Sequence, residues 1–321
     1  MGHAAREGLT QAVHAHERFL WGLCYRMTGV AADAEDLVQE TFARALASPP
    51  ARTDELRPWL TRVAVNLARD LLRRRKREGY VGPWLPSPVD TGEEELPPPG
   101  VEARLPGGGS TEGRYALLES VSFAFLLALE ALSPKQRAVL LLRDVFDYSV
   151  REVAEALRMS EPNVKVVHHR ARAAMAAYDG ARCLPTRELQ ARSRAALEGF
   201  LGALLTGDVA AAEALLASDV CALSDGGGQY RAARVPVWGV ERVLLLYRRL
   251  MEMRGPPSAA ELRMLNGLPA VVSVFPPSRR DPRLSTQLVV RVDLDADGRI
   301  SQVHSILTDR KLAGLRMPVP A

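Results

Sequence analysis

Side chains that can carry positive charge recur at helical spacing in residues 159–175. Lys165, His169 and Arg172 follow one another at i, i+4 and i+7, with Arg170 beside them. The opposite side carries an apolar set: Val164, Val167, Ala171 and Ala174. Because both sets keep the helical period, the pattern predicts an amphipathic helix with a cationic face. Such a helix fits the major groove of DNA, where cations contact phosphates and guanine edges; plain core architecture is the alternative.

A second cationic face is predicted on a helix over 58–77. It comprises Trp59, Arg62, Asn66, Arg69, Arg73 and Arg77, opposite an apolar stripe of Leu60, Val63, Leu67 and Leu71. Arginines one turn apart repel, so an anionic ligand is a reason to keep them together. Bases of single-stranded nucleic acid stack on an indole while cations hold the phosphates. A solvated basic face with Trp59 in the core is the alternative.

A third helix, predicted over 34–47 with Asp33 as its N-cap, has the opposite charge. Its polar face carries Asp36, Gln39 and Glu40, with Glu35 close by. An acidic face gains nothing from approaching phosphate. We therefore expect it to meet solvent or a basic protein surface.

Capping signals position the helix of 159–175 within a larger motif. Ser133-Pro134-Lys135-Gln136 has the spacing of a capping box, and Ser149 with Glu152 repeats it. The second helix is expected to end near Arg158, and Ser160 is the expected cap of the third. Two short helices joined by a tight turn predict a helix-turn-helix.

Composition indicates several domains in a chain of 321 residues with 47% apolar and 25% charged residues. We predict helices over 1–80, an acidic, Pro/Gly-rich linker over 81–113, helices over 114–180, and a third domain over 184–321. Three widely spaced cysteines show no metal-ligand pattern and suggest a reducing compartment. No signal peptide or membrane-length apolar run is visible, so we expect a cytoplasmic protein. We also expect no metal and no cofactor.

The third domain is predicted to combine helices with strands. Helices are expected over 186–207, 208–218 and 239–253, and strands around 219–235, 261–266, 269–275, 284–294 and 299–308. Asp295-Ala296-Asp297-Gly298 is a strong hairpin signal. These elements predict an antiparallel sheet covered by helices, an α+β fold.

The order of these elements over residues 10–178 resembles the extracytoplasmic-function (ECF) sigma factors of bacterial RNA polymerase. The resemblance is carried by DAEDLVQETFARAL, RPWLTRVAVNLARDLLRRRKR and ALSPKQRAVLLLRDVFDYSVREVAEAL. In that family a σ2 module docks on the β′ clamp helices and opens the −10 element, while a σ4 module binds the β flap and reads the −35 element. The resemblance therefore implies polymerase contacts by Asp33, Glu35, Asp36 and Glu40, −10 contacts by Arg62, Asn66, Arg69 and Arg73, and −35 contacts by Lys165, His169, Arg170 and Arg172.

The C-terminal domain resembles the cone-shaped SnoaL-like α+β domains appended to one sigma subfamily. The resemblance rests on WLPSP at 84–88, DGGG at 225–228 and NGLPAVV at 266–272. It implies regulation in cis, in which Trp84, Leu85 and Pro86 of the first motif dock on the other two motifs. The residues expected to receive them are Asp225, Gly226, Gly227, Gly228, Asn266 and Gly267. Local packing of Trp84 on σ2, and glycines that serve only a turn, are the alternatives.

A different class of function is also open: a ligand-sensing DNA-binding regulator, or an enzyme with an accessory helix-turn-helix. A SnoaL-like cavity could bind an unknown small ligand, and Asp219, Asp225 and His304 are candidate bases by residue type. Nothing pairs them at a diagnostic spacing. His168 and His169 lack metal-ligand spacing, and we propose no metal.

Overall fold

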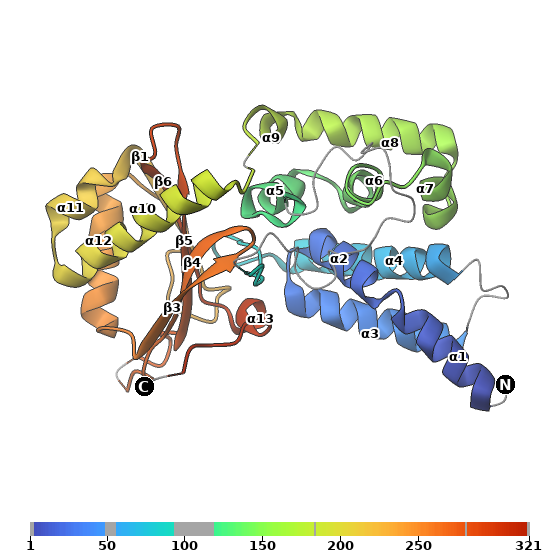
Figure 1. Ribbon diagram of the computed structural model, residues 1–321, viewed down its shortest axis with the longest axis horizontal. Helices are drawn as coiled ribbons and strands as arrows, with labels where there is room; N and C mark the ends of the chain where they lie inside the picture. Colours follow the sequence, from blue (N-terminus) through green and yellow to red (C-terminus); the bar gives the residue numbers. More distant parts are fainter. Residues whose placement is uncertain (1–2, 49–55, 93–118, 183, 280, 320–321) are drawn as a thin grey trace. The chain divides into compact units, whose positions relative to one another are not determined.

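The computed structural model describes residues 3–48, 56–92, 119–182, 184–279 and 281–319. The chain forms two compact units, one of Met1–Glu78 with Leu96–Cys183 and one of Gly79–Glu95 with Leu184–Ala321 (Figure 1). Residues 93–113 of the predicted linker, which include the acidic residues of the GEEEL run and the glycines at 107–109, lie outside the described residues. Residues 79–92, which the sequence assigned mainly to that linker, belong instead to the second unit.

The first unit is helical, as predicted for both sigma-like modules. The N-terminal group comprises α1 (His3–His14), α2 (Glu17–Thr28), α3 (Ala31–Ala47) and α4 (Leu56–Glu78). The second group comprises α5 (Phe123–Ala128), α6 (Pro134–Asp144), α7 (Val150–Leu157), α8 (Glu161–Ala174) and α9 (Ala176–Gly180), with 3-10 turns at Glu119–Val121 and Leu129–Ala131.

Local capping explains where these helices begin and end. Capping boxes at Ser133 and Ser149 are both present, which confirms the predicted starts of α6 and α7. Arg158 takes the left-handed conformation at φ 51° that glycine usually supplies between the two helices of the motif. The prediction of Asp33 as N-cap is wrong. Gly29 ends α2 at φ 68°, and the chain re-enters a helix at once with Val30 as the N-cap.

Buried arginines join the two helical groups of the first unit. The Arg26 side chain is fully buried and donates from Nε to Ser120 Oγ at 2.8 Å. Burial lowers the pKa of Arg26 to about 9. Arg137 donates to the carbonyl of Met27 at 2.7 Å, and Arg57 donates to Tyr148 Oη at 3.0 Å. These contacts hold α2 and α4 against the helices of the second group.

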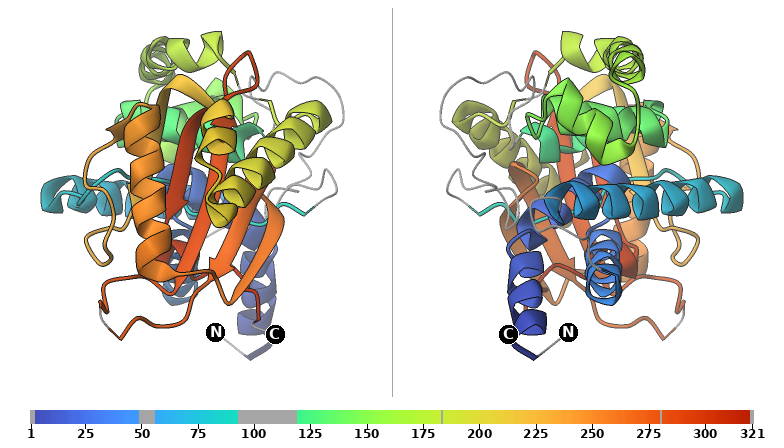
Figure 2. Two further views of the ribbon diagram at one scale, coloured as in Figure 1. Left: turned by 90° about the vertical axis from the view of Figure 1, so that its left-hand side faces the viewer. Right: turned by 90° about the vertical axis from the view of Figure 1, so that its right-hand side faces the viewer.

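The second unit is a six-stranded sheet in the order β2-β1-β6-β5-β4-β3. The strands are β1 (Leu216–Asp225), β2 (Val237–Trp238), β3 (Ala259–Leu265), β4 (Leu268–Val274), β5 (Gln287–Leu294) and β6 (Ile300–Ile306). Helices α10 (Arg187–Thr206) and α12 (Val240–Arg254), with α11 (Val209–Ala214), cover one face (Figures 1 and 2). A short helix α13 (Asp309–Leu312) follows β6.

The prediction of a purely antiparallel sheet is wrong at one pair of strands. β1 and β6 are parallel, with Ser224 beside Ser305. They stand at opposite ends of the domain sequence, so no hairpin forces them to be antiparallel. The predicted hairpin between β5 and β6 is confirmed, since Asp295 N–H bonds to the carbonyl of Arg299 at 2.9 Å.

Candidate nucleic-acid interfaces and linker-docking site

The cationic face of α8 is exposed and its apolar face is buried. Val164 and Ala171 are fully buried and Val167 is nearly so, whereas Lys165, His169 and Arg170 are exposed. Ala174, predicted on the apolar stripe, is exposed, and Met175 is buried in its place. α8 packs on α6 and α7, so the face that carries Lys165 points away from the protein core.

Arg172 departs from the predicted exposed ridge because a carboxylate holds it. Its guanidinium donates to Asp144 from Nη2 at 2.7 Å and from Nε at 3.1 Å, and His168 Nε2 lies 2.9 Å from the same carboxylate. Burial alone would raise the pKa of Asp144, but hydrogen bonds from His168 and Arg172 outweigh it and lower that pKa. Arg172 therefore ties α8 to the end of α6.

The polar face of α4 combines exposed and half-buried side chains. Asn66 and Arg73 are exposed, while Trp59, Arg62 and Arg69 are half-buried. Arg69 Nη1 lies 3.4 Å from Asn66 Oδ1, and Arg73 Nη1 lies 3.4 Å from Asp70 Oδ1. The face thus keeps guanidinium groups, an amide and an indole in one row along the helix.

The buried face of α4 differs from the predicted apolar stripe. Of that stripe only Leu60 is buried; the buried set is Leu56, Leu60, Thr61, Ala64, Val65, Ala68 and Leu72. α4 packs against α2, α3, α6 and α7, and the small side chains of Ala64 and Ala68 allow close approach. A helical wheel that gives most weight to large aliphatic residues does not identify a buried face that contains alanines.

The acidic face predicted for α3 is present except at its first member. Glu35, Asp36 and Glu40 are exposed, but Asp33 is buried, with only 7% of its surface exposed. Glu40 forms an ion pair with Arg44 at 2.7 Å, one turn along the helix. The carboxylates that a partner could reach are therefore those of Glu35, Asp36 and Glu40.

Residues 80–91 run along the second unit, and we call this segment the strap. Leu85 and Ser87 are fully buried in it, and Pro86 and Pro88 are also buried. Its three proline residues stiffen the backbone, which lowers the entropy lost on docking. The strap lies on two parts of the domain, the end of β1 and the edge strand β3, which are the parts that carry the DGGG and NG motifs.

At the end of β1, the Asp225 carboxylate collects three donors and is fully buried. It accepts hydrogen bonds from Tyr80 Oη, from the backbone N–H of Leu85 at 2.7 Å, and from Lys311 Nζ. Lys311 also donates to the carbonyl of Leu85 and lies 4.7 Å from the ring centres of both Tyr80 and Trp84. Sequence reasoning missed Lys311 and Tyr80, since neither stands in a recognisable motif.

The glycines after Asp225 lie too close to their neighbours for a side chain. A Cβ on Gly227 would lie 2.4 Å from Thr308 Cγ2 and 3.2 Å from Tyr80 Oη, and its φ is 52°. A Cβ on Gly228 would lie 3.3 Å from Val81 Cβ, at φ 77°. Both positions need glycine for conformation and for the approach of the strap.

At the other end, the strap adds an isolated bridge to the free edge of β3. Asp90 pairs with Leu265, and Thr91 N–H donates to the carbonyl of Met264 at 2.9 Å. Asn266 Oδ1 accepts from Val89 N–H at 2.8 Å, and Gly267 N–H donates to Thr91 Oγ1 at 3.1 Å. The NG motif thus serves both as the two-residue β3–β4 turn and as a receptor for the strap.

The three candidate bases do not meet in one site. Asp219 is exposed, whereas Asp225 and His304 are buried. Their neighbours Ser224 and Ser305 line a cavity under α12, so Asp225 and His304 face the other side of the sheet. His304 Nε2 lies 2.9 Å from Gln302 Oε1, and burial lowers the pKa of His304 to about 4.

Within the described ranges, no group of three or more His, Cys, Asp or Glu side chains could hold a metal ion. No helix in the part of the chain that the structure describes is long and apolar enough to cross a membrane.

Comparison with known proteins matches both helical groups of the first unit. The family model of Sigma-70 region 2 matches residues 12–78, and that of Sigma-70, region 4 matches residues 122–175. The ECF RNA polymerase sigma factor SigG of Mycobacterium tuberculosis is 40% identical over 172 residues, which cover 49% of this chain and 45% of SigG.

The similarity to a second relative extends through the C-terminal domain. The ECF RNA polymerase sigma factor SigJ of Mycobacterium tuberculosis is 30% identical over 304 residues, covering 94% of this chain and 92% of SigJ. Its crystal structure matches with a TM-score of 0.66 at 28% identity, over 95% of this chain and 98% of that chain. The chain therefore belongs to the extracytoplasmic-function sigma factors, which direct core RNA polymerase to promoter DNA.

Proposed function

We propose that the strap and the C-terminal domain control in cis how this sigma factor engages polymerase and promoter. The observation that carries the proposal is the burial of Asp225 and Lys311 against the strap. The strap belongs to the chain between the two sigma modules, and in the family that connection is expected to follow the polymerase surface. A strap held in the second unit cannot extend along polymerase at the same time. Docking therefore restrains initiation, and core polymerase competes for the segment.

Polymerase docking is assigned to the acidic face of α3. Exposure of Glu35, Asp36 and Glu40 supports contact with the basic clamp helices of β′. Asp33, which is mostly buried, would orient the helix instead. The second module would meet the β flap, as the family resemblance implies.

Promoter recognition is divided between α4 and α8. The row of Trp59, Arg62, Asn66, Arg69 and Arg73 on α4 suits the unpaired −10 strand, because an aromatic ring can stack on a base beside cations. The exposed Lys165, His169 and Arg170 of α8 suit the −35 duplex. The chain would catalyse no reaction of its own and would act in the cytoplasm, with polymerase.

Run-off transcription with purified core polymerase over a genomic promoter library tests this function. The full chain should co-purify with core enzyme and start transcripts at a defined promoter set. Lys311→Met should raise the output several-fold, because it releases the strap. Arg310→Met is the matched control, since it removes a neighbouring but exposed charge from α13. Equal output from Lys311→Met and wild type would refute control by the strap, and absence of any transcript would refute the assignment of the modules.

A further inference from the structure

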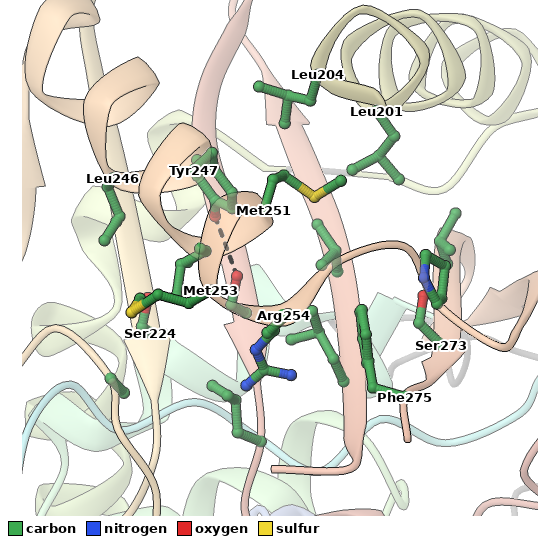
Figure 3. Close-up of a pocket in the computed structure, with 18 of the residues that line it drawn as sticks. Leu201, Leu204, Ser224, Leu246, Tyr247, Met251, Met253, Arg254, Ser273 and Phe275 are labelled. Atoms are coloured by element: carbon green, nitrogen blue, oxygen red, sulfur yellow. Dashed lines mark hydrogen bonds between the residues drawn. The ribbon is translucent and has the colours of Figure 1, made fainter. Parts of the chain in front are cut away.

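An apolar cavity of about 330 Å³ lies in the second unit between α10, α12 and the sheet. That volume is at the lower end of the range of about 300–1,000 Å³ for small-molecule sites. Leu201, Leu204, Tyr247, Met251 and Phe275 are among the side chains around it (Figure 3). Its described lining contains no aspartate, glutamate, lysine or histidine. A ligand of this cavity would be mostly hydrocarbon.

Arg254, the last residue of α12, brings a positive charge into this apolar lining. Its Nη1 donates to the carbonyl of Ser285 at 2.9 Å, and its guanidinium carbon lies 5.1 Å from the centre of the Phe275 ring. Figure 3 shows the guanidinium among the side chains that line the cavity. Burial lowers the pKa of Arg254. An arginine nevertheless stays protonated at neutral pH.

The hydrogen bonding of this guanidinium is incomplete. Nη2 of Arg254 is buried and has no hydrogen-bond partner among the described residues, and no carboxylate among them forms an ion pair with Arg254. The other arginine of the lining, Arg231, is paired with Asp281 at 3.1 Å. Buried charges in proteins are normally paired, because an unpaired charge loses its hydration without compensation. Within the part of the chain that the structure describes, the guanidinium in the cavity lining therefore lacks both a negatively charged partner and an acceptor for Nη2.

We propose that this cavity binds a small amphipathic acid, with its carboxylate on Arg254 and its hydrocarbon body among the leucine, methionine and phenylalanine side chains. A carboxylate can accept a hydrogen bond from Nη2 and supply the missing counter-ion. Tyr247 and Ser305, which share a hydrogen bond of 3.0 Å, add polar oxygen atoms to the lining. This site is a property of the second unit alone and does not depend on the sigma function.

Calorimetric titration of the full-length chain with three ligands of one chain length tests the proposal. Decanoate, decan-1-ol and decyltrimethylammonium share a ten-carbon body and differ in head-group charge. Decanoate should bind at least about tenfold more tightly than decyltrimethylammonium, because a charged hydrogen bond favours only the anion. Equal binding of the two, or no binding of decanoate over its soluble range, would overturn the proposal. This comparison needs no variant.

A pair of variants then places the anion on Arg254. Arg254→Met removes the guanidinium but keeps an unbranched side chain, and it should weaken decanoate binding at least about tenfold while leaving decan-1-ol binding unchanged. Arg249→Met removes an exposed charge from the same helix, outside the cavity lining, and should change neither. Unchanged decanoate affinity in Arg254→Met, with the variant folded by circular dichroism, would contradict the assignment.

Discussion

Lys311 Nζ and Asp225 Oδ2 form an ion pair in the interior of the second unit, where the two side chains are 5% and 0% exposed. The pair stands between β1 and α13 and holds the backbone of Leu85 on both its N–H and its carbonyl. Leu85, in the chain between the two sigma modules, is thus part of the interior of the C-terminal domain. The stability of this domain and the regulation proposed for it depend on the same contacts.

Breaking this pair from one side should be costly. Lys311→Met leaves the Asp225 carboxylate buried without its cation, and we expect the free energy of unfolding to fall by about 3 kcal/mol. Arg310→Met, on the same short helix but exposed, should change it by less than about 0.5 kcal/mol. Urea unfolding followed by circular dichroism measures both. The double variant with Asp225→Asn should lose clearly less than the sum of the two single losses; strict additivity would argue against the pair.

The glycine turn after Asp225 offers a second test, which concerns the close packing beside the strap. Gly227→Ala combines an unfavourable φ of 52° with a Cβ that would lie 2.4 Å from Thr308 Cγ2. Gly207→Ala has a similar φ of 74° with nothing within 4 Å, so it reports the backbone cost alone. Gly227→Ala should therefore unfold at clearly lower urea concentration than Gly207→Ala. Equal midpoints would mean that close packing at Gly227 contributes nothing.

The sequence predicted the helical modules well because their signals are local. Ser133 and Ser149 carry complete capping boxes, and the helices begin where those boxes predict. The docking of the strap could be inferred from the WLPSP, DGGG and NG motifs, but the part played in it by Lys311 could not. Lys311 lies 86 residues from Asp225 in the chain, and no local pattern distinguishes it from a surface lysine.

Other differences from the predicted pattern arise from contacts between elements. Arg172, which the sequence places on an exposed ridge, forms an ion pair with Asp144, 28 residues earlier in the chain. The predicted apolar stripe of α4 differed from its buried face, because Ala64, Val65 and Ala68 are buried there while Val63, Leu67 and Leu71 are only partly buried. The parallel pairing of β1 with β6 depends on the order of strands across the whole sheet.

A pH dependence should follow from His304. Burial lowers the pKa of His304 to about 4; the charge of Asp293 opposes this shift and that of Arg291 adds to it. The Oε1 atom of Gln302 lies within hydrogen-bond distance of His304 Nε2. A histidine with a lowered pKa contributes stability that is complete above about pH 6.5 and is lost as the pH falls toward 4. Wild type should lose about 2 kcal/mol more than His304→Gln between pH 7 and pH 5. Parallel pH profiles of the two in urea unfolding would contradict this role.

The exposed face of α8 should govern binding to promoter DNA. Lys165→Ala and Arg170→Ala should each reduce the slope of log affinity against log salt by about 1, as expected for one lost phosphate contact. Arg249→Ala, an exposed arginine in the second unit, is the control and should leave the slope unchanged. Fluorescence anisotropy over a salt series measures it. Slopes that match wild type in both α8 variants would remove this helix from the interface.

Arg172→Ala should behave differently from the other α8 variants. It leaves the buried Asp144 carboxylate with His168 alone, so the free energy of unfolding should fall by about 1–2 kcal/mol, reduced by the partial exposure of Arg172. Thermal or urea unfolding measures the loss. A variant as stable as wild type but deficient in DNA binding would show that Arg172 contacts DNA directly.

Hydrogen–deuterium exchange of the strap amides tests the central proposal most directly. The N–H groups of Leu85, Val89 and Thr91 all donate to the second unit in the free protein and should exchange slowly there. On addition of core RNA polymerase and promoter DNA, the account predicts that these three amides exchange at least about tenfold faster, as the strap leaves the C-terminal domain. Unchanged protection in a complex that is actively starting transcripts would contradict it.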